Sequence, residues 1–352
     1  MKPVLGTILF VLLGLTAAAG IGFYPTLSMA PIVKDDEQTG FDQELVIKFS
    51  HVVAENTPKG LAASHFAQRV KETTGGRVKV EVFPNGVLYT ESDEFEALMR
   101  GNVQMIAPSF SNVSEVVPAF ALWDLPFAFR GNEAILEAFS GEIGKRLFDK
   151  LGAKNTVGLA YWGNGFRQIT SNRGPIVHPS DFQGLKFRIL PSKVIETYFH
   201  ALDVKTVPIP FNDVYRALES GSVDGEENSI SNINSKKFYQ VQKYMTLSDH
   251  SYLGYAVLMN KSYWDRIPAD LKEQIMDAMR ETTSWANQNA IRMNQEQLIE
   301  IERRRDIRIT TLSPEEKAEW IRVWNALYPQ FEGIIGRDLM ASIRKLQQKY
   351  GG

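Results

Sequence analysis

The chain has 352 residues, 44% of them apolar and 23% charged, which is the composition of a globular protein with room for two domains. Its formal net charge of −2 provides no basic excess, so nucleic acid is not expected as a partner. The sequence has no cysteine, which excludes disulfides, a thiolate nucleophile and cysteine-based metal sites.

The first residues are predicted to be an export segment. Lys2 precedes an uncharged apolar run over residues 4–24, and an acidic group at residues 35–37 follows. This charge order places the N-terminus in the cytoplasm and the remainder outside. Small residues within the run offer a cleavage site, but its length is also about the ~20 residues that span a bilayer. Residues 1–35 are therefore interpreted as a signal peptide, with a retained inner-membrane anchor as the alternative, and the chain from about residue 42 is expected in the periplasm.

Strand and helix patterns alternate after this segment. Alternating apolar residues predict strands at 45–50, 78–82 and 103–108, and helical spacing predicts helices at 58–74 and 90–99, the second capped by Thr90. Such a β-α-β order implies a mainly parallel sheet with helices on its faces.

The same kind of pattern recurs in the second half. Strands are expected at 157–162, 185–190, 204–208 and 252–260, and helices at about 192–202, 212–220 and 268–305, and from Ser313 to about Tyr350. Gly163-Asn-Gly165 is interpreted as a turn, and Asn212 as a helix cap.

Two α/β units followed by long helices predict an α/β fold with two lobes, each a mainly parallel sheet flanked by helices, and a ligand cleft between them. Lobe I is assigned to residues 42–165 with about 250–292 returning to it, and lobe II to residues 166–249 with about 293–352. In open α/β sheets, ligands bind beyond the carboxyl ends of strands.

Arg188 is the first candidate for a binding residue. In Leu185-Lys-Phe-Arg-Ile-Leu190, one strand face is apolar and the other carries Lys186 and Arg188. An arginine on a rigid strand can hold a carboxylate through two parallel hydrogen bonds. The plainer interpretation is a surface arginine or one paired with a structural carboxylate.

Three further cations could bind a second carboxylate. Arg167 follows the Gly-Asn-Gly segment, His51 ends the first strand, and Lys59 lies at a helix start, where unpaired backbone N–H groups favour an anion. The plainer alternatives are a solvated loop charge, a strand-end histidine and an exposed lysine. Together with Arg188, they favour a site for a small dianion.

Several neutral residues are weaker candidates. Asn228 and Asn232, four residues apart, are expected to share a helix face, and Phe211 could line a cleft, although caps and core packing are common alternatives. The acidic residues at 224, 226 and 227 are interpreted as a solvated turn after Gly221.

Signals of catalysis are poor. The sequence has no zinc-protease, nucleophile-elbow, P-loop or dinucleotide motif, and the histidines at 51, 65, 178, 200 and 250 lack metal-ligand spacing. No cofactor, metal or catalytic residue is therefore expected.

Six blocks in order resemble the DctP-type periplasmic solute receptors of TRAP (tripartite ATP-independent periplasmic) transporters. The resemblance runs from about residue 45 to about residue 350. The blocks are Phe49-Ser-His-Val-Val-Ala-Glu-Asn-Thr-Pro-Lys-Gly60, Asn164-Gly-Phe-Arg-Gln168, Gly184-Leu-Lys-Phe-Arg188, Phe211-Asn-Asp-Val-Tyr215, Val223-Asp-Gly-Glu-Glu-Asn228 and Lys236-Lys-Phe-Tyr239.

The resemblance implies a receptor that closes on an organic acid and delivers it to the small and large membrane subunits of a permease. By family position, Arg188 pairs with the ligand carboxylate, and Arg167 and Asn228 line the site. Phe211 matches the aromatic residue of its block. Ser109 and Glu91 match loop positions that contact larger ligands in other branches. The opening block resembles the C4-dicarboxylate branch, which takes succinate, fumarate or malate.

Two departures leave the exact acid open. Glu226 stands where family members often have glutamine, and close dicarboxylate relatives can carry lysine in place of Arg167. The expected function is a monomeric C4-dicarboxylate receptor. The alternatives are a sensory protein that presents an organic acid to a kinase or chemoreceptor, and a periplasmic enzyme that acts on a carboxylate.

Overall fold

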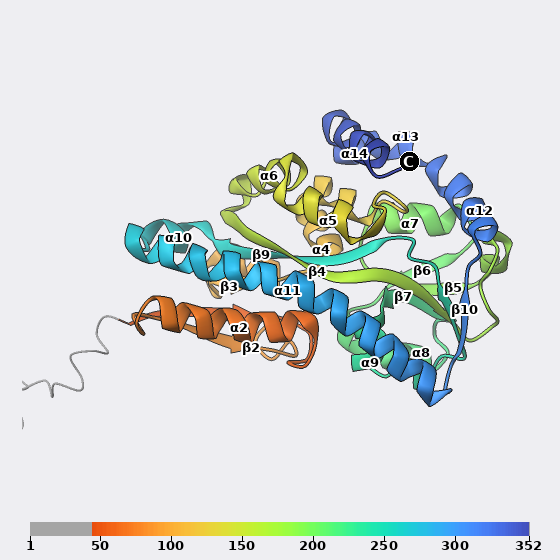
Figure 1. Cartoon of the computed structure of the whole chain (residues 1–352), viewed down its shortest axis with the longest axis horizontal. Coiled ribbons are helices and arrows are strands. Elements are labelled where there is room, and N and C mark those ends of the chain that lie inside the picture. Colours follow the sequence, from red (N-terminus) through yellow and green to blue (C-terminus); the bar gives the residue numbers. More distant parts are fainter. Residues whose placement is uncertain (1–43, 352) are drawn as a thin grey trace, which may run out of the picture. The chain divides into compact units, whose positions relative to one another are not determined.

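The computed structural model describes residues 44–351, which form a mixed sheet with helices on both faces (Figure 1). The strands are β1 (Leu45–Ser50), β2 (Val78–Phe83), β3 (Met105–Ile106), β4 (Thr156–Ser171), β5 (Lys186–Ile189), β6 (Lys205–Pro208), β7 (Gly225–Ser229), β8 (Tyr244–Leu247), β9 (Tyr252–Asn260) and β10 (Arg308–Thr311). Their order is β2-β1-β3-β9-β4-β7-β5-β6, with β8 paired to β4 and β10 to β8. Pairing is parallel towards both ends and antiparallel around β4 and β9. The predicted α/β class is confirmed.

β4 joins the two halves of the sheet. Its first half pairs with β9 and its second half with β7 and β8. The predicted turn at 163–165 lies inside this strand, where register shifts mark bulges. A Cβ at Gly163 would overlap the Tyr252 hydroxyl, and one at Gly165 would come within 3.0 Å of the Asn294 side chain. The turn prediction was wrong because glycine also marks close approach within a strand.

The helices predicted from periodicity are present, and the structure adds α4, α5, α6 and α10, which the sequence did not predict. They are α2 (Pro58–Thr73), α3 (Glu94–Arg100), α4 (Phe110–Val116), α5 (Gly131–Ser140), α6 (Glu142–Asp149), α7 (Lys193–His200), α8 (Val214–Glu219), α9 (Ile230–Ser235), α10 (Lys261–Arg266), α11 (Ala269–Arg304), α12 (Pro314–Asn325), α13 (Tyr328–Ile335) and α14 (Arg337–Lys349). The capping box predicted at Ser313 is present, with Glu316 as its partner.

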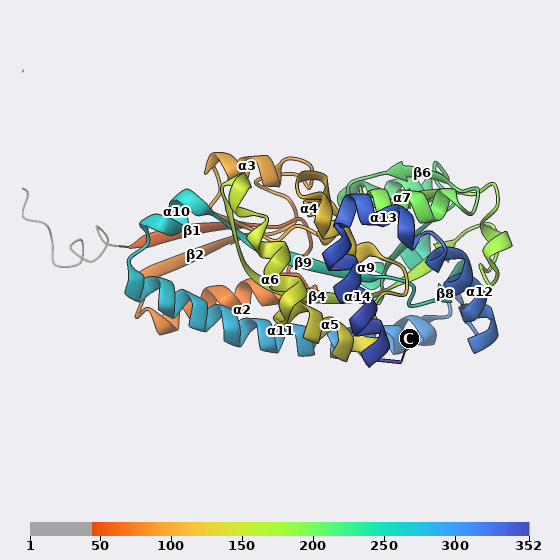
Figure 2. The same ribbon diagram turned by 90° about the horizontal axis from the view of Figure 1, so that it is seen from above.

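The long helix α11 crosses both halves of the sheet. Its 36 residues span about 54 Å at 1.5 Å per residue. It lies beside α2 in both views (Figures 1 and 2), where the rings of His65 and Trp285 stack with centroids 4.5 Å apart. Further along, the Asn294 side chain accepts a hydrogen bond from the Ser231 amide at the start of α9. One helix therefore contacts elements from both halves.

Two helix starts differ from the prediction. α3 begins at Glu94 because the Thr90 hydroxyl donates to the Asp93 carboxylate rather than capping a helix. Asn212 lies in a 3₁₀ segment before α8, and its amide donates to the Asn85 carbonyl. In both cases the polar side chain bonds outside the helix that it was expected to cap.

The predicted export segment lies outside the described residues. Within 44–351, no helix is both long enough and apolar enough to cross a bilayer. Leu45–Gly352 cluster as one compact unit. The boundaries of the two lobes stay a prediction.

Candidate ligand-binding site

A small cavity lies where the loops after several strands converge. Its volume is about 20 Å³, roughly the room that one water molecule needs. It is lined by Val52, Val53, Lys59, Glu91, Ser109, Arg188, Leu190, Phe211, Asn228, Asn232, Leu253 and Tyr255. Most of these residues follow β1, β2, β3, β5, β6 or belong to β7 and β9, so the cavity lies at the edge where open α/β sheets bind ligands.

Arg188 provides two free donors to this cavity. Its side chain is fully buried, and its Nε donates to the Ile209 carbonyl at 2.8 Å. Nη1 and Nη2 have no hydrogen-bond partner among the described residues. Burial lowers the pKa of Arg188, and the negative charges of Glu91 and Glu226 oppose that shift. A buried guanidinium with both Nη groups unpaired is suited to a bidentate bond with a carboxylate.

Lys59 is the second cation of the cavity wall. Thr57 caps α2 by accepting from the Gly60 amide, and this cap places Lys59 in the first helical turn. The Nζ donates to the Ala107 carbonyl at 2.8 Å and lies 3.8 Å from the ring centroid of Tyr255. Burial lowers the pKa of Lys59 to about 8, although nearby carboxylates raise it. Lys59 is therefore mostly charged at neutral pH.

His51 is buried outside this lining. Neither ring nitrogen has a partner within the described part of the chain. Burial and the positive charge of Lys59 lower the pKa of His51 to about 3. The imidazole is therefore neutral at physiological pH and adds no positive charge.

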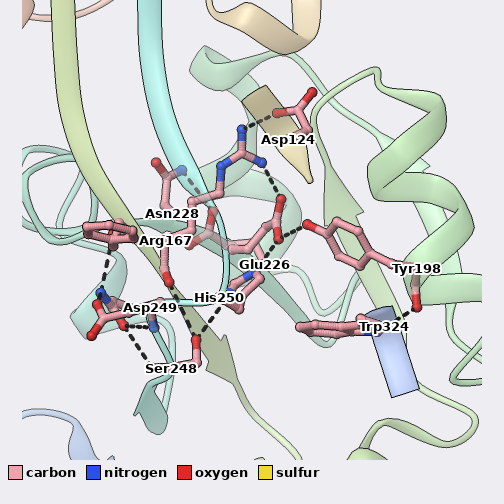
Figure 3. Close-up of polar contacts among 12 residues, drawn as sticks. Asp124, Arg167, Tyr198, Glu226, Asn228, Ser248, Asp249, His250 and Trp324 are labelled. Atoms are coloured by element: carbon pink, nitrogen blue, oxygen red, sulfur yellow. Dashed lines mark hydrogen bonds and ion pairs between the residues drawn. The ribbon is translucent and has the colours of Figure 1, made fainter. Parts of the chain in front are cut away.

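Arg167 also lies outside the lining, in a buried polar network (Figure 3). Its guanidinium donates to Asp124 at 3.0 Å, to Glu227 and to the Ser111 hydroxyl. Although burial alone would raise it, the pKa of Glu227 is lowered to about 2, chiefly by Arg167. Two carboxylates thus balance this arginine, and only its Nε lacks a partner among residues 44–351.

The network extends to two aromatic side chains. The Tyr198 hydroxyl donates to Glu227 at 2.5 Å, and His250 Nε2 lies 2.7 Å from the same oxygen. His250 Nδ1 in turn lies 2.8 Å from the Ser248 hydroxyl. These contacts connect β4, β7 and the segment before β9 in the middle of the sheet.

The predicted neutral residues line the cavity, from elements other than those expected. Asn228 belongs to strand β7 and Asn232 to helix α9, so the shared helix face was wrong. The Asn232 amide donates to Asn228 Oδ1 at 2.8 Å, and the Asn228 amide donates to Glu226 at 2.9 Å. Phe211 contributes a buried ring.

Ser109 contributes to the wall while capping a helix. Its hydroxyl accepts from the Asn112 amide and donates to Asn112 Oδ1. The hydroxyl is therefore already engaged at the start of α4.

Two glutamates were misjudged as solvated. Glu226 and Glu227 are 0% and 2% exposed within β7. Burial raises the pKa of Glu226 to about 7, partly offset by Arg188. The sequence contained one signal, because two adjacent acids could balance the charges of Arg167 and Arg188. Spacing along the chain could not show that these charges lie close together.

An α/β fold with a polar cavity at its strand ends is an arrangement suited to a receptor for a small solute. The family model for "Bacterial extracellular solute-binding protein, family 7" (DctP) matches residues 49–333, and the chain belongs to this family. The chain is 46% identical to the C4-dicarboxylate-binding protein DctB of Bacillus subtilis, over 99% of both chains. It is 42% identical to the C4-dicarboxylate-binding periplasmic protein DctP of Rhodobacter capsulatus, over 86% of this chain and 91% of that one.

Solved structures agree with this assignment. A TRAP periplasmic solute-binding protein of Sulfurospirillum deleyianum with bound succinate superposes with a TM-score of 0.83 at 43% identity, covering 86% of this chain and 99% of that one. A TRAP periplasmic solute-binding protein of Pseudomonas aeruginosa with bound L-malate gives a TM-score of 0.79 at 34% identity, covering 81% and 99%.

Proposed function

We propose that this chain is a periplasmic receptor for a C4-dicarboxylate that it delivers to the membrane subunits of a TRAP transporter. The observation that carries the proposal concerns the two buried Nη groups of Arg188, which have no partner within residues 44–351 and face a cavity that Lys59 also lines. Burying a cation whose donors are unused costs free energy unless an anion accepts their hydrogen bonds. Two separate cations in one small cavity favour an acid with a carboxylate at each end.

In this proposal the two carboxylates have different partners. Arg188 holds one end through Nη1 and Nη2, and Lys59 holds the other. Asn228 and Asn232 supply neutral polar contacts, while Ser109 and Phe211 complete the wall. Arg167 contributes at most its Nε, because its other donors already serve Asp124, Glu227 and Ser111. His51 lies outside the lining and, as a neutral imidazole, brings no charge to the ligand.

The relatives support the C4 assignment. The two curated relatives described above carry C4-dicarboxylate binding in their names, and the two solved neighbours hold succinate and L-malate. We extend this ligand class to the present chain, together with capture in the periplasm and release to a permease.

Calorimetric titration tests this function. The purified chain, unfolded and refolded to remove carried-over ligand, is titrated with succinate, fumarate, malate, lactate and sialic acid. We expect micromolar or tighter binding of a C4 diacid and no response to lactate or sialic acid. Binding of a monocarboxylate alone would contradict the two-ended site, and binding of none of the five acids would contradict the receptor assignment for C4 acids.

A further inference from the structure

Glu91 places a carboxylate in the wall of the cavity, beside the two cations. It lies in the turn between β2 and α3 and is partly exposed. Its negative charge opposes the burial-driven fall in the pKa of Arg188, and also raises the pKa of Lys59. Glu91 is therefore within electrostatic range of both cations that the proposed ligand would use.

A hydrogen bond from a loop at the opposite end of the sheet fixes the position of the Glu91 carboxylate. Glu91 Oε2 accepts a hydrogen bond from the backbone amide of Phe211 at 2.8 Å. A second bond joins the same two loops, from the Asn212 amide to the Asn85 carbonyl at 3.2 Å. These loops follow β2 and β6, which are the two ends of the strand order. The contact thus closes the cavity and keeps Glu91 in its wall.

The charges of the wall leave little capacity for a further anion. Lys59 and Arg188 supply two positive charges, and Glu91 supplies a negative one. Behind the wall, burial raises the pKa of Glu94 to about 8 and that of Glu226 to about 7, so neither is fully ionised at neutral pH.

A third cation lies nearby but outside the lining. Lys236 donates to Asn212 Oδ1 at 2.8 Å, and its Nζ lies 4.9 Å from the ring centroid of Phe211. It is therefore already engaged by the loop that holds Glu91.

We propose that Glu91 is a specificity-determining residue that limits the bound acid to two carboxylates. The inference rests on the proposed function, because it concerns the same cavity. Each carboxylate of a diacid meets a cation, whereas a third carboxylate would share the closed cavity with Glu91, and the described lining offers it no further cation. Like charges at close range and low dielectric repel strongly, so the receptor rejects tricarboxylates by charge as well as by size.

The test compares two ligands of similar size. Tricarballylate is succinate with an added carboxymethyl group, and ethylsuccinate has a methyl group in place of the third carboxylate. Both are titrated calorimetrically, alongside succinate, into the full chain at neutral pH. We expect wild type to bind ethylsuccinate at least 100-fold more tightly than tricarballylate.

The variant Glu91→Gln keeps an oxygen that accepts from Phe211 but removes the charge. In this variant, we expect the ratio of the Kd for tricarballylate to the Kd for ethylsuccinate to be at least tenfold smaller than in wild type. The matched control is Glu96→Gln, because Glu96 is exposed on α3, pairs with Arg100 and carries the same charge outside the cavity. Melting curves verify folding, and Glu91→Ser replaces Glu91→Gln if that variant fails to fold.

The outcomes separate the two proposals. The role of Glu91 is overturned if this Kd ratio falls less than tenfold in Glu91→Gln, or if it falls equally in Glu96→Gln. Succinate binding would still support the receptor function in either case. If wild type rejects ethylsuccinate as strongly as tricarballylate, size sets the limit and the charge role is overturned. Wild type that binds no diacid at all refutes the receptor function itself.

Discussion

The two buried arginines differ in what surrounds their guanidinium groups. Arg167 and Arg188 are 1% and 0% exposed, so burial does not distinguish them. Arg167 is balanced by Asp124 and Glu227, whereas Arg188 retains two donors without partners in the described structure. The surroundings of Arg167 are therefore those of a structural ion pair, whereas those of Arg188 suit the binding of an anion.

Replacing Arg188 should remove ligand affinity without unfolding the receptor. We expect Arg188→Ala to weaken binding of the C4 acid by at least ~100-fold, about 3 kcal/mol. Arg188→Lys should also be impaired, because an ammonium cannot reproduce the planar fork. Calorimetry measures both, with Arg173→Ala as the control, since Arg173 is exposed and pairs with Asp224. Near-native affinity of Arg188→Ala would rule out Arg188 as the clamp.

Replacing Arg167 should instead lower stability. Arg167→Met leaves the carboxylates of Asp124 and Glu227 buried without their shared cation. Breaking a buried ion pair on one side typically costs about 3–5 kcal/mol. Urea unfolding should show a loss of that size. Arg188→Met should show no comparable loss, because Arg188 forms no ion pair with a carboxylate within residues 44–351. Equal stability of the two variants would argue against this distinction.

The affinity should depend on pH through Lys59. Because its pKa is about 8, Lys59 is charged below that value and becomes neutral above it. Glu226, with a pKa of about 7, gains negative charge between about pH 6 and 8 and acts in the same direction. Succinate affinity should therefore fall about tenfold or more from pH 7 to 9. Titrations of Lys59→Gln should show weaker binding at pH 7 and a smaller decline from pH 7 to 9 than wild type, because only Glu94 and Glu226 still titrate in this range. An unchanged pH profile would show that Lys59 does not contact the ligand.

At the scale of elements, the start of α2 carries Lys59 into the cavity. The chain turns tightly before this helix, and a Cβ at Gly60 would overlap the Ala54 carbonyl and approach Glu55 O to 2.6 Å. The clash is with backbone atoms, so the loop before α2 would have to move. The position of the second cation therefore depends on a glycine that never touches the cavity.

Gly60→Ala should weaken both folding and binding. We expect a loss of about 1–3 kcal/mol in the free energy of unfolding from overpacking, and weaker succinate binding as Lys59 shifts. Gly333→Ala is the control, because a Cβ there meets nothing within 4 Å on the helix α13. Thermal melts and calorimetry check both variants, and full stability of Gly60→Ala would show that the loop adapts freely.

At the scale of the whole described structure, closure of the cavity depends on contacts between opposite ends of one sheet. The loops after β2 and β6 meet through Glu91 and Phe211 and through Asn85 and Asn212. The second bond, from the Asn212 side chain to the Asn85 backbone carbonyl, is exposed to solvent and therefore contributes little free energy. A cavity of about 20 Å³ is smaller than a four-carbon diacid, so its walls must separate to admit one.

Hydrogen exchange should detect this opening. We expect saturating succinate to slow exchange at least tenfold at the amide of Phe211 and in the loops 84–93 and 209–213. Central amides of the β4–β9 ladder should change little, because these strands are paired throughout the sheet. Mass spectrometry with and without ligand measures the difference. Uniform protection over the chain would argue against a hinged closure.

Sequence patterns alone were enough to predict the family, the α/β class and many of the elements, and to single out Arg188 as a candidate. Local periodicity predicted β9 at its observed bounds and α11 within one residue at each end, since their patterns depend on neighbours along the chain. Arg188 was identifiable because its strand shows a clear alternation of apolar and charged residues.

Which charged side chains pair with one another depends on the tertiary structure. Arg167 pairs with Glu227, 60 residues away, and with Asp124, 43 residues away. The glutamates of β7 were expected in solvent because a run of acids is usually exposed, and the fold buries them beside two arginines. Electrostatic pairing depends on distance in space and on exclusion of water, and neither is encoded by spacing along the chain. The different partners of Arg167, Arg188 and Lys59 are therefore set by the folding of the sheet, which brings distant loops together.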